Sequence, residues 1–129
     1  KKHVIPIDRK HFDPIVEGMQ MVIKGGTGRR AQVDSIAIAG KTGTVQNPHG
    51  DDHSVFIAFA PVENPKIALI VYVENGVWGS RYAAPIAGLL IEKYLKGKIS
   101  DRKKPLEKEM FQGSLIHNTT SKVKETSNE

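Results

Sequence analysis

Residues 36–46, Ile-Ala-Ile-Ala-Gly-Lys-Thr-Gly-Thr-Val-Gln, decide how this chain folds. The first half of the stretch is β-rich and alternates in the way of a strand, and it runs into the polar group Lys41-Thr42-Gly43-Thr44. A second strand-like run follows within ten residues. The sequence therefore predicts a β-sheet that begins with residues 36–46.

Two further strands are predicted after this stretch. Residues 53–60 form the first, and Pro61 ends it; residues 66–74 form the second. Between them, Glu63-Asn64-Pro65 are turn residues, which favours an antiparallel hairpin. Residues 66–74 are apolar almost throughout, so we expect this strand to be buried on both faces.

A helix is predicted on each side of the sheet in the sequence. The first has Asp13 as its N-cap and Pro14 at its first helical position, and Gly25-Gly26 end it. The second runs from about residue 80 to residue 96, and Gly97 stops it. Together these elements give an α+β fold in which helices flank a three-stranded antiparallel sheet.

The amino-acid composition of the chain excludes several classes of function. The net charge of +5 raises nucleic acid as a partner, but the basic residues are scattered and only Arg102-Lys103-Lys104 form a run, so no nucleic-acid partner is expected. The absence of cysteine excludes disulfides and thiol catalysis. No apolar run approaches the ~20 residues that a membrane span requires.

The composition changes after Ile99, which divides the chain into two parts. Residues 1–99 carry the predicted helices and strands, whereas residues 100–129 are polar and charged and are predicted to be a loosely ordered tail. The tail has one apolar island, at Met110, Phe111, Leu115 and Ile116. Because the chain starts at Lys1 with no initiator methionine and no signal-peptide pattern, we expect it to be a piece of a longer protein.

Lys41-Thr42-Gly43-Thr44 is the group that could carry chemistry. Gly43 has no Cβ, so a ligand backbone could approach the strand closely. The hydroxyls of Thr42 and Thr44 can bind a carboxylate, and Lys41 supplies a positive charge that favours an anion. An unpaired edge of the strand would bind an extended peptide. The same four residues would also suit an exposed strand that has no ligand.

Three other groups of residues could carry a function. The loop His49-Gly50-Asp51-Asp52-His53 contains metal-ligating side chains, but a turn also favours Asp and Gly, so no metal site is predicted and contact with a substrate is preferred. Trp78 and Tyr82 are expected to be buried against the start of the second helix rather than to line a cleft. Arg29-Arg30 are expected to be solvated.

The order and spacing of several phrases resemble the C-terminal part of a penicillin-binding protein transpeptidase domain. Those phrases are Ala-Gly-Lys-Thr-Gly-Thr-Val-Gln (39–46), Phe-Ile-Ala-Phe-Ala-Pro (56–61), Asn-Pro-Lys-Ile-Ala-Leu-Ile-Val-Tyr-Val-Glu-Asn-Gly (64–76) and Ala-Ala-Pro-Ile-Ala (83–87). They are most similar to class B proteins of the penicillin-binding protein 2 type. The resemblance covers about residues 3–97 and implies a fragment of the β-lactamase/transpeptidase-like fold.

The resemblance also implies roles for the matching residues. Lys41 would lie beside the serine of the family's Ser-x-Asn motif and assist proton transfer and carboxylate binding. Thr42, Gly43 and Thr44 would bind the substrate, whose terminal D-alanine or β-lactam carboxylate would lie on the two hydroxyls. The backbone N–H of Thr44 would form one half of the oxyanion hole. No cofactor is implied.

The function implied for the parent protein is a peptidoglycan D,D-transpeptidase that cross-links stem peptides through a serine acyl-enzyme and binds penicillin. It would be anchored in the bacterial inner membrane by a segment absent from this sequence and would work on the periplasmic face. Its partners would be the D-Ala-D-Ala end of a stem peptide and β-lactams. This chain would expose an unpaired strand edge through which it could self-associate.

The family's nucleophile is not found in a usable place in this sequence. The two matches to Ser-x-x-Lys begin at Ser100 and Ser121, and both lie in the charged tail downstream of Lys41. Ser-x-Asn does not occur. Since covalent catalysis needs a nucleophile within reach of its base, the chain alone is predicted to be inactive.

Two alternative functions stay open at this point. A serine β-lactamase or D,D-carboxypeptidase shares the Lys-Thr-Gly strand and would use the same carboxylate-binding residues. A non-catalytic binding module could have kept the fold and lost the serine. The first alternative predicts a water-activating glutamate outside this sequence, and the second predicts that no Ser-x-x-Lys lies upstream.

Overall fold

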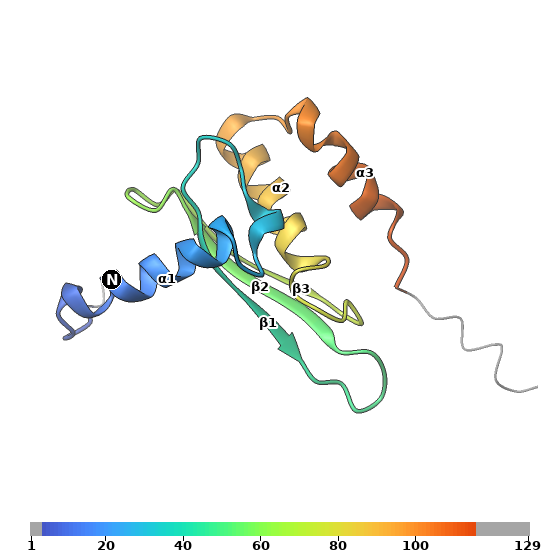
Figure 1. Ribbon diagram of the computed structural model, residues 1–129, viewed down its shortest axis with the longest axis horizontal. Coiled ribbons are helices and arrows are strands. Elements are labelled where there is room, and N and C mark those ends of the chain that lie inside the picture. The colour runs from blue at the N-terminus through green and yellow to red at the C-terminus, as the bar shows by residue number, and fades with distance from the viewer. Residues whose placement is uncertain (1–3, 116–129) are drawn as a thin grey trace, which may run out of the picture.

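The computed structural model describes residues 4–115, which form one antiparallel sheet with helices around it (Figure 1). The sheet has the order β1-β2-β3, and both pairs of neighbours are antiparallel. This confirms the predicted α+β class and the three-stranded sheet. The elements are η1 (Arg9–His11), α1 (Asp13–Lys24), η2 (Arg29–Ala31), β1 (Ala39–Val45), β2 (His53–Ala60), β3 (Ile67–Val73), α2 (Ala83–Lys96), η3 (Asp101–Lys103) and α3 (Lys104–Gln112).

The two faces of the sheet differ in how much they are covered. The face that carries Phe56, with no exposed surface, and Ala58, at 5% exposure, packs under α2 and the segment between α1 and β1. The opposite face carries Ile57 at 45%, Ile70 at 66% and Tyr72 at 50% exposure. The prediction that β3 is buried on both faces is therefore wrong for the described residues, because α2 covers one face only.

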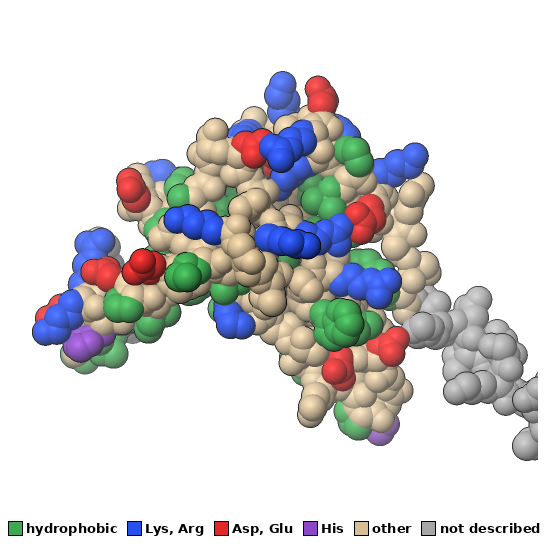
Figure 2. Space-filling model, in the orientation of Figure 1, with side chains coloured by type: hydrophobic (Ala, Val, Ile, Leu, Met, Phe, Trp, Pro, Cys, Tyr) green, Lys and Arg blue, Asp and Glu red, His purple; other side chains and the backbone are tan. Residues whose placement is uncertain are grey.

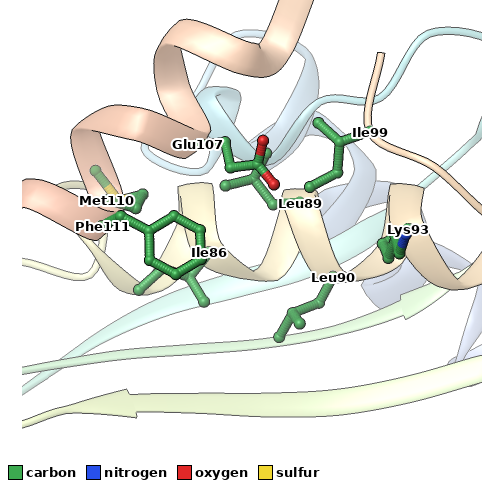
Figure 3. Close-up of a pocket in the computed structure, with 8 residues that line it drawn as sticks. All are labelled: Ile86, Leu89, Leu90, Lys93, Ile99, Glu107, Met110 and Phe111. Atoms are coloured by element: carbon green, nitrogen blue, oxygen red, sulfur yellow. The ribbon is translucent and has the colours of Figure 1, made fainter.

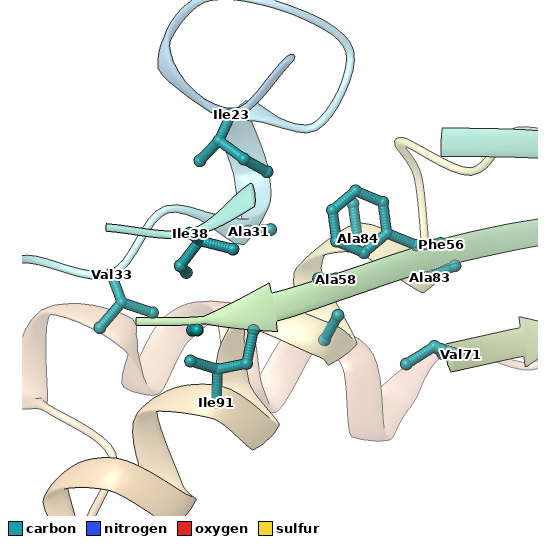
Figure 4. Close-up of a cluster of buried hydrophobic side chains, with 12 residues drawn as sticks. Ile23, Ala31, Val33, Ile38, Phe56, Ala58, Val71, Ala83, Ala84 and Ile91 are labelled. Carbon is teal, nitrogen blue, oxygen red and sulfur yellow. The ribbon is translucent and has the colours of Figure 1, made fainter. Parts of the chain in front are cut away.

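A single apolar cluster joins the covered face of the sheet to α2 (Figure 4). Small residues let α2 approach closely: a Cβ built on Gly88 would lie 2.7 Å from the carbonyl oxygen of Ala31 in η2. The absence of a side chain at Gly88 thus lets the backbone of α2 pack directly against the backbone of η2. The buried members of the cluster are Ile23, Ala31, Val33, Ile38, Phe56, Ala58, Ala60, Val71, Ala83, Ala84, Ala87 and Ile91.

The helix α1 begins and ends close to its predicted bounds. Asp13 is its first residue rather than its N-cap, Phe12 occupies the cap, and the cap makes no side-chain hydrogen bond. Gly25 follows the last helical residue, as predicted. Only Ile23 of this helix is buried, because α1 contacts the sheet mainly along β1. Within residues 4–115 no helix is both long enough and apolar enough to cross a lipid bilayer.

The helix α2 starts three residues later than predicted. It begins at Ala83, so Pro85 lies in its first turn, where a proline needs no amide hydrogen bond. Gly97 follows its last residue with φ of 75°, in the left-handed region that favours glycine. The late start leaves residues 78–82 as a loop that lies near β1.

The prediction of a loosely ordered tail from residue 100 is wrong for residues 101–112. These residues form η3 and α3, and α3 lies beside α2 (Figure 1). Figure 3 shows Met110 and Phe111 of α3 across from Ile86 and Leu89 of α2. The apolar island in the charged sequence is therefore one face of a helix. The remainder of the island at Ile116, and the tail up to residue 129, lie outside the described residues.

Buried charge joins α2 to the start of α3. The Glu92 side chain is 1% exposed, and its carboxylate lies 3.7 Å from Lys96 Nζ. Burial lowers the pKa of the Lys103 ammonium, while the carboxylates of Glu92 and Asp34 act in the opposite direction. Within residues 4–115, Glu92 Oε2 and Lys103 Nζ are the buried side-chain atoms without a hydrogen-bond partner. The Lys103 ammonium of η3 thus lies in the field of the buried Glu92 carboxylate of α2.

Substitution of Gly88 by alanine should destabilise the fold. A Cβ there meets the backbone of Ala31, so the overpacking cost of about 1–3 kcal/mol exceeds the ~1 kcal/mol that alanine normally gains in a helix. We expect Gly88→Ala to lower Tm by several degrees in a thermal unfolding experiment. The matched control is Gly18→Ala in α1, where a Cβ meets nothing within 4 Å. That control should raise Tm or leave it unchanged, and equal effects at both positions would contradict the packing argument.

Candidate functional site

The residues Lys41-Thr42-Gly43-Thr44 lie in the middle of β1, which is an edge strand of the described sheet. Since β2 pairs with only one side of β1, alternate backbone N–H and C=O groups of β1 point away from the sheet. An extended peptide could hydrogen-bond to these groups as an added strand. The described fold thus leaves the motif at an edge that a peptide can reach.

Alternation along β1 places the lysine and the threonines on opposite faces. Lys41 is opposite Ile57, on the open face of the sheet, while Thr42 is opposite Phe56 on the covered face. The Lys41 ammonium donates a hydrogen bond of 2.8 Å to the carbonyl of Thr42. It makes no ion pair within the described part of the chain. Lys41 and the hydroxyls can therefore act on one ligand only along the edge of β1.

A cavity of about 320 Å³ lies on the covered face beside the motif. One wall is Thr42, Gly43 and Thr44, and the other comes from the loops before and after the sheet. The hydroxyls of Thr27 and Thr42 lie 2.7 Å apart and share a hydrogen bond. The cavity is lined by Thr27, Thr42, Gly43, Thr44, Trp78, Gly79 and Ser80. Hydroxyls and a glycine strand in one cavity suit a carboxylate at the end of a peptide.

The loop after β3 is held against the motif by close backbone contact. A Cβ on Gly79 would lie 2.5 Å from the carbonyl oxygen of Val55 and 2.8 Å from that of Gly43, so only glycine fits there. Ser54 is completely buried, and its hydroxyl donates to the carbonyl of Trp78 at 2.9 Å. Val77 has φ of 62°, an unusual value for a β-branched residue that costs about 1–3 kcal/mol. The loop is thus fixed in a strained form.

The expectation that Trp78 is buried against α2 is wrong. Its side chain is 64% exposed and lines the cavity. Thr27 and Ser80 were not singled out in the sequence as site residues, and both line the cavity. The one sequence signal for Thr27 was its place in the polar loop after Gly25-Gly26.

Arg30 is not simply solvated, as the sequence suggested, but connects three segments. Its Nη1 donates to the carbonyl of Arg81 at 3.0 Å, which lies in the loop before α2. Its Nη2 lies 2.7 and 2.6 Å from the two carboxylate oxygens of Glu109 in α3. The guanidinium of Arg30 therefore ties α3 to both loops that wall the cavity. Arg29 is exposed, as expected.

Asp52 and His53 make structural contacts around the loop of residues 49–53. The Asp52 carboxylate accepts the backbone N–H of Asn47 at 3.0 Å. His53 Nδ1 accepts the backbone N–H of Asn75 at 3.1 Å, and its ring lies 5.4 Å from the ring of Tyr72. Within residues 4–115, no group of three or more His, Asp or Glu side chains is placed to hold a metal ion. This loop joins β1 to β2, next to the end of the motif strand.

Substitution of Glu109 by glutamine should loosen the loop next to the cavity. The Arg30–Glu109 pair is partly exposed, so the free energy of unfolding should change by less than about 1 kcal/mol. The amide of Arg81, which donates to Trp78 at 2.9 Å, should exchange its hydrogen severalfold faster by NMR.

The control for this experiment lies on the same helix. Glu107→Gln removes a carboxylate that lies 2.8 Å from Lys104 Nζ, and this ion pair lies wholly within α3. It should leave the exchange of the Arg81 amide unchanged. Equal exchange rates in the Glu109 and Glu107 variants would show that Arg30 does not couple α3 to the cavity.

Comparison with known proteins identifies the family of this chain. Residues 1–92 match the family described as the penicillin binding protein transpeptidase domain. Peptidoglycan D,D-transpeptidase MrdA of Haemophilus influenzae is 37% identical in an alignment of 100 residues, and the match covers 64% of this chain and 15% of that protein. The chain therefore spans well under two thirds of the length of this curated relative.

Two solved structures are also similar. Penicillin-binding protein 2 of Pseudomonas aeruginosa has a TM-score of 0.64 and 37% identity, over 78% of this chain and 23% of that one. Penicillin-binding protein A of M. tuberculosis, solved as an imipenem acyl-enzyme complex, has a TM-score of 0.57 and 33% identity, over 69% of this chain and 20% of that one. These likenesses confirm the resemblance to the penicillin-binding protein 2 type. The chain belongs to the penicillin-binding protein transpeptidase domain family.

Proposed function

We propose that this chain supplies the carboxylate-binding strand and one half of the oxyanion hole of a peptidoglycan D,D-transpeptidase. The parent enzyme would cross-link stem peptides through a serine acyl-enzyme and would bind penicillin at the same site. The observation that carries the proposal is the position of Lys41-Thr42-Gly43-Thr44 on an edge strand beside a hydroxyl-lined cavity. Family membership and the named transpeptidase relatives support it.

The proposed substrate lies along the outer edge of β1 as an added strand. Its terminal D-alanine carboxylate lies on the hydroxyls of Thr42 and Thr44, and Gly43 lets its backbone approach. Lys41 holds the proton of a neighbouring hydroxyl in place and attracts the carboxylate. The Thr44 N–H donates to the oxygen that becomes negative when a serine attacks the carbonyl carbon. The imipenem acyl-enzyme of the M. tuberculosis relative supports a β-lactam as a second ligand of the same strand.

The attacking serine is proposed to come from another part of the parent protein. Ser100, one of the two matches to the family pattern, follows the far end of α2. This helix has 14 residues and starts near the cavity, so its far end, which precedes Ser100, lies about 20 Å along the helix from its start. Ser121 lies outside the described residues. The chain supplies binding groups without a nucleophile, and alone it should be inactive.

The parent is proposed to work at the periplasmic face of the bacterial inner membrane, held there by a segment outside this chain. The open face of the sheet and the outer edge of β3 would contact the part that carries the serine. Exposed Ile57, Ile70 and Tyr72 give that face an apolar surface suited to such a contact. Without that part, the same surface would favour self-association of the chain.

Reading the coding region upstream of Lys1 tests the proposal most directly. A frame that encodes a membrane anchor, Ser-x-x-Lys and then Ser-x-Asn would support the transpeptidase. A frame without those serines would contradict it and favour a binding module. A fluorescent penicillin should label the parent covalently and leave the 129-residue chain unlabelled. Covalent labelling of the isolated chain would show that it carries its own nucleophile.

Substitution of Lys41 by methionine should slow acylation of the parent by penicillin. Loss of a group that handles a proton or stabilises charge in the transition state typically costs at least about 100-fold in rate. The rate is measured by stopped-flow with a fluorescent penicillin. The control is Lys66→Met, which removes an exposed lysine just before β3. A Lys41 variant that is acylated as fast as the control would remove Lys41 from the proposed site.

A further inference from the structure

Thr27 faces the motif inside the cavity beside β1, which we call the groove. The groove is bounded by Thr42, Gly43 and Thr44 on one side and by Thr27 and residues 78–80 on the other. Thr27 Oγ1 and Thr42 Oγ1 lie 2.7 Å apart, and either of them can be the donor. Within residues 4–115 neither hydroxyl makes another hydrogen bond. The geometry of Thr42 in the motif is therefore linked to a residue outside the motif.

The backbone around Thr27 is fixed by the last turn of α1. The N–H of Gly28 donates to the carbonyl of Val22 at 3.0 Å. A Cβ built on Gly26 would lie 2.9 Å from Val22 Cα, so the chain just before Thr27 has no room for a side chain. The threonine is thus presented to the groove by a turn that packs tightly on both of its sides.

One aromatic ring supports both threonines from below. Phe56 is completely buried, and it lies opposite Thr42 in the pairing of β1 with β2. A Cβ on Gly40 of β1 would lie 2.6 Å from this ring, and a Cβ on Gly28 would lie 3.1 Å from it. The strand that carries Thr42 and the turn that carries Thr27 therefore pack on the same side chain, which limits how far the two hydroxyls can move apart.

A carboxylate ligand decides the direction of this hydrogen bond. A carboxylate only accepts hydrogen bonds, so Thr42 must use its single hydroxyl proton to bind one. The hydrogen bond between the two threonines then needs the proton of Thr27. Figure 2 shows Lys and Arg side chains gathered across the middle of this face, over the segment between α1 and β1, and no Asp or Glu of residues 4–115 lines the groove. These surroundings favour an anionic ligand.

We propose that Thr27 is a positioning residue, whose hydroxyl donates to Thr42 Oγ1 and directs the Thr42 proton toward the carboxylate of the peptide. The inference rests on the proposed function and adds to it a residue outside the Lys-Thr-Gly-Thr motif. Hydrogen bonds in a chain polarise one another, so the bond from Thr42 to the carboxylate is strengthened. Thr27 acts on the ligand through Thr42 and makes no contact with it.

Binding of acetyl-D-Ala-D-Ala to the 129-residue chain tests the inference. Trp78 is the only tryptophan of the chain and lines the groove, so its indole NMR signal reports the titration. We expect Thr27→Val to weaken binding about three- to tenfold, which is the range for the loss of one hydrogen bond. Thr27→Ser keeps the hydroxyl and should bind within about twofold of the wild type.

A double-mutant cycle separates positioning from a structural role. Thr42→Val alone should weaken binding, because it removes the hydroxyl that contacts the carboxylate. In that background Thr27→Val should cause no further loss, since the hydroxyl that it directs is gone. A structural change of the groove would instead weaken binding by the same factor in both backgrounds.

The results distinguish this inference from the function on which it rests. Equal losses in the two backgrounds, no loss in Thr27→Val, or no rescue by Thr27→Ser would each overturn the inference. A loss in Thr42→Val would leave the proposed function standing in all three cases. A wild-type chain that does not bind the peptide, or a Thr42→Val variant that binds it equally well, would count against the proposed function and overturn the inference with it.

Discussion

The hydroxyl of Ser54 is the contact on which the arrangement of the site depends. It is completely buried in β2, directly opposite Thr44 of the motif. It donates to the carbonyl of Trp78 at 2.9 Å and accepts the N–H of Ala83 at 3.2 Å. One side chain thus pairs with the carbonyl of Trp78 in the loop and with the N–H of the first residue of α2. Since a buried amide without a partner costs about 1–3 kcal/mol, this hydroxyl favours the start of α2 at Ala83.

The positions of the two walls of the groove follow from these hydrogen bonds of Ser54. The loop must cross β1 and β2 so closely that residue 79 has no room for a side chain, and this contact forms the wall opposite Thr42. The other wall, at Thr27, is fixed from the far side by Arg30 and Glu109. A groove thus forms beside the hydroxyls and the free edge of β1, because elements that are distant in sequence cover this strand.

The sequence predicted the features that depend on neighbouring residues. The strands, the hairpin and the end of α2 at Gly97 follow from alternation, turn residues and helix punctuation, and all of them were found. The motif itself was recognised because its four residues are contiguous.

The features that were missed depend on contacts between distant residues. Trp78 was expected to be buried, and nothing local shows that Val77 adopts a positive φ or that the indole is exposed. Arg30 meets Glu109 across 79 positions of sequence. The helix α3 was overlooked because its composition is charged, although Leu106 and Met110 have helical spacing. The charged composition of α3 reflects its exposed surface, whereas the packing of this helix depends on its few apolar residues.

The burial of Glu92 has a consequence for where the folding unit ends. The family match stops at residue 92 and Gly97 closes the last helix that the sequence predicted, so either position looks like a natural boundary for a recombinant fragment. Yet this carboxylate is 1% exposed, and the segment over it contains the lysine at position 103 that faces its charge. A fragment cut at Gly97 would lose that lysine along with Glu109. The smallest unit that keeps both the core and the groove intact therefore extends to Gln112.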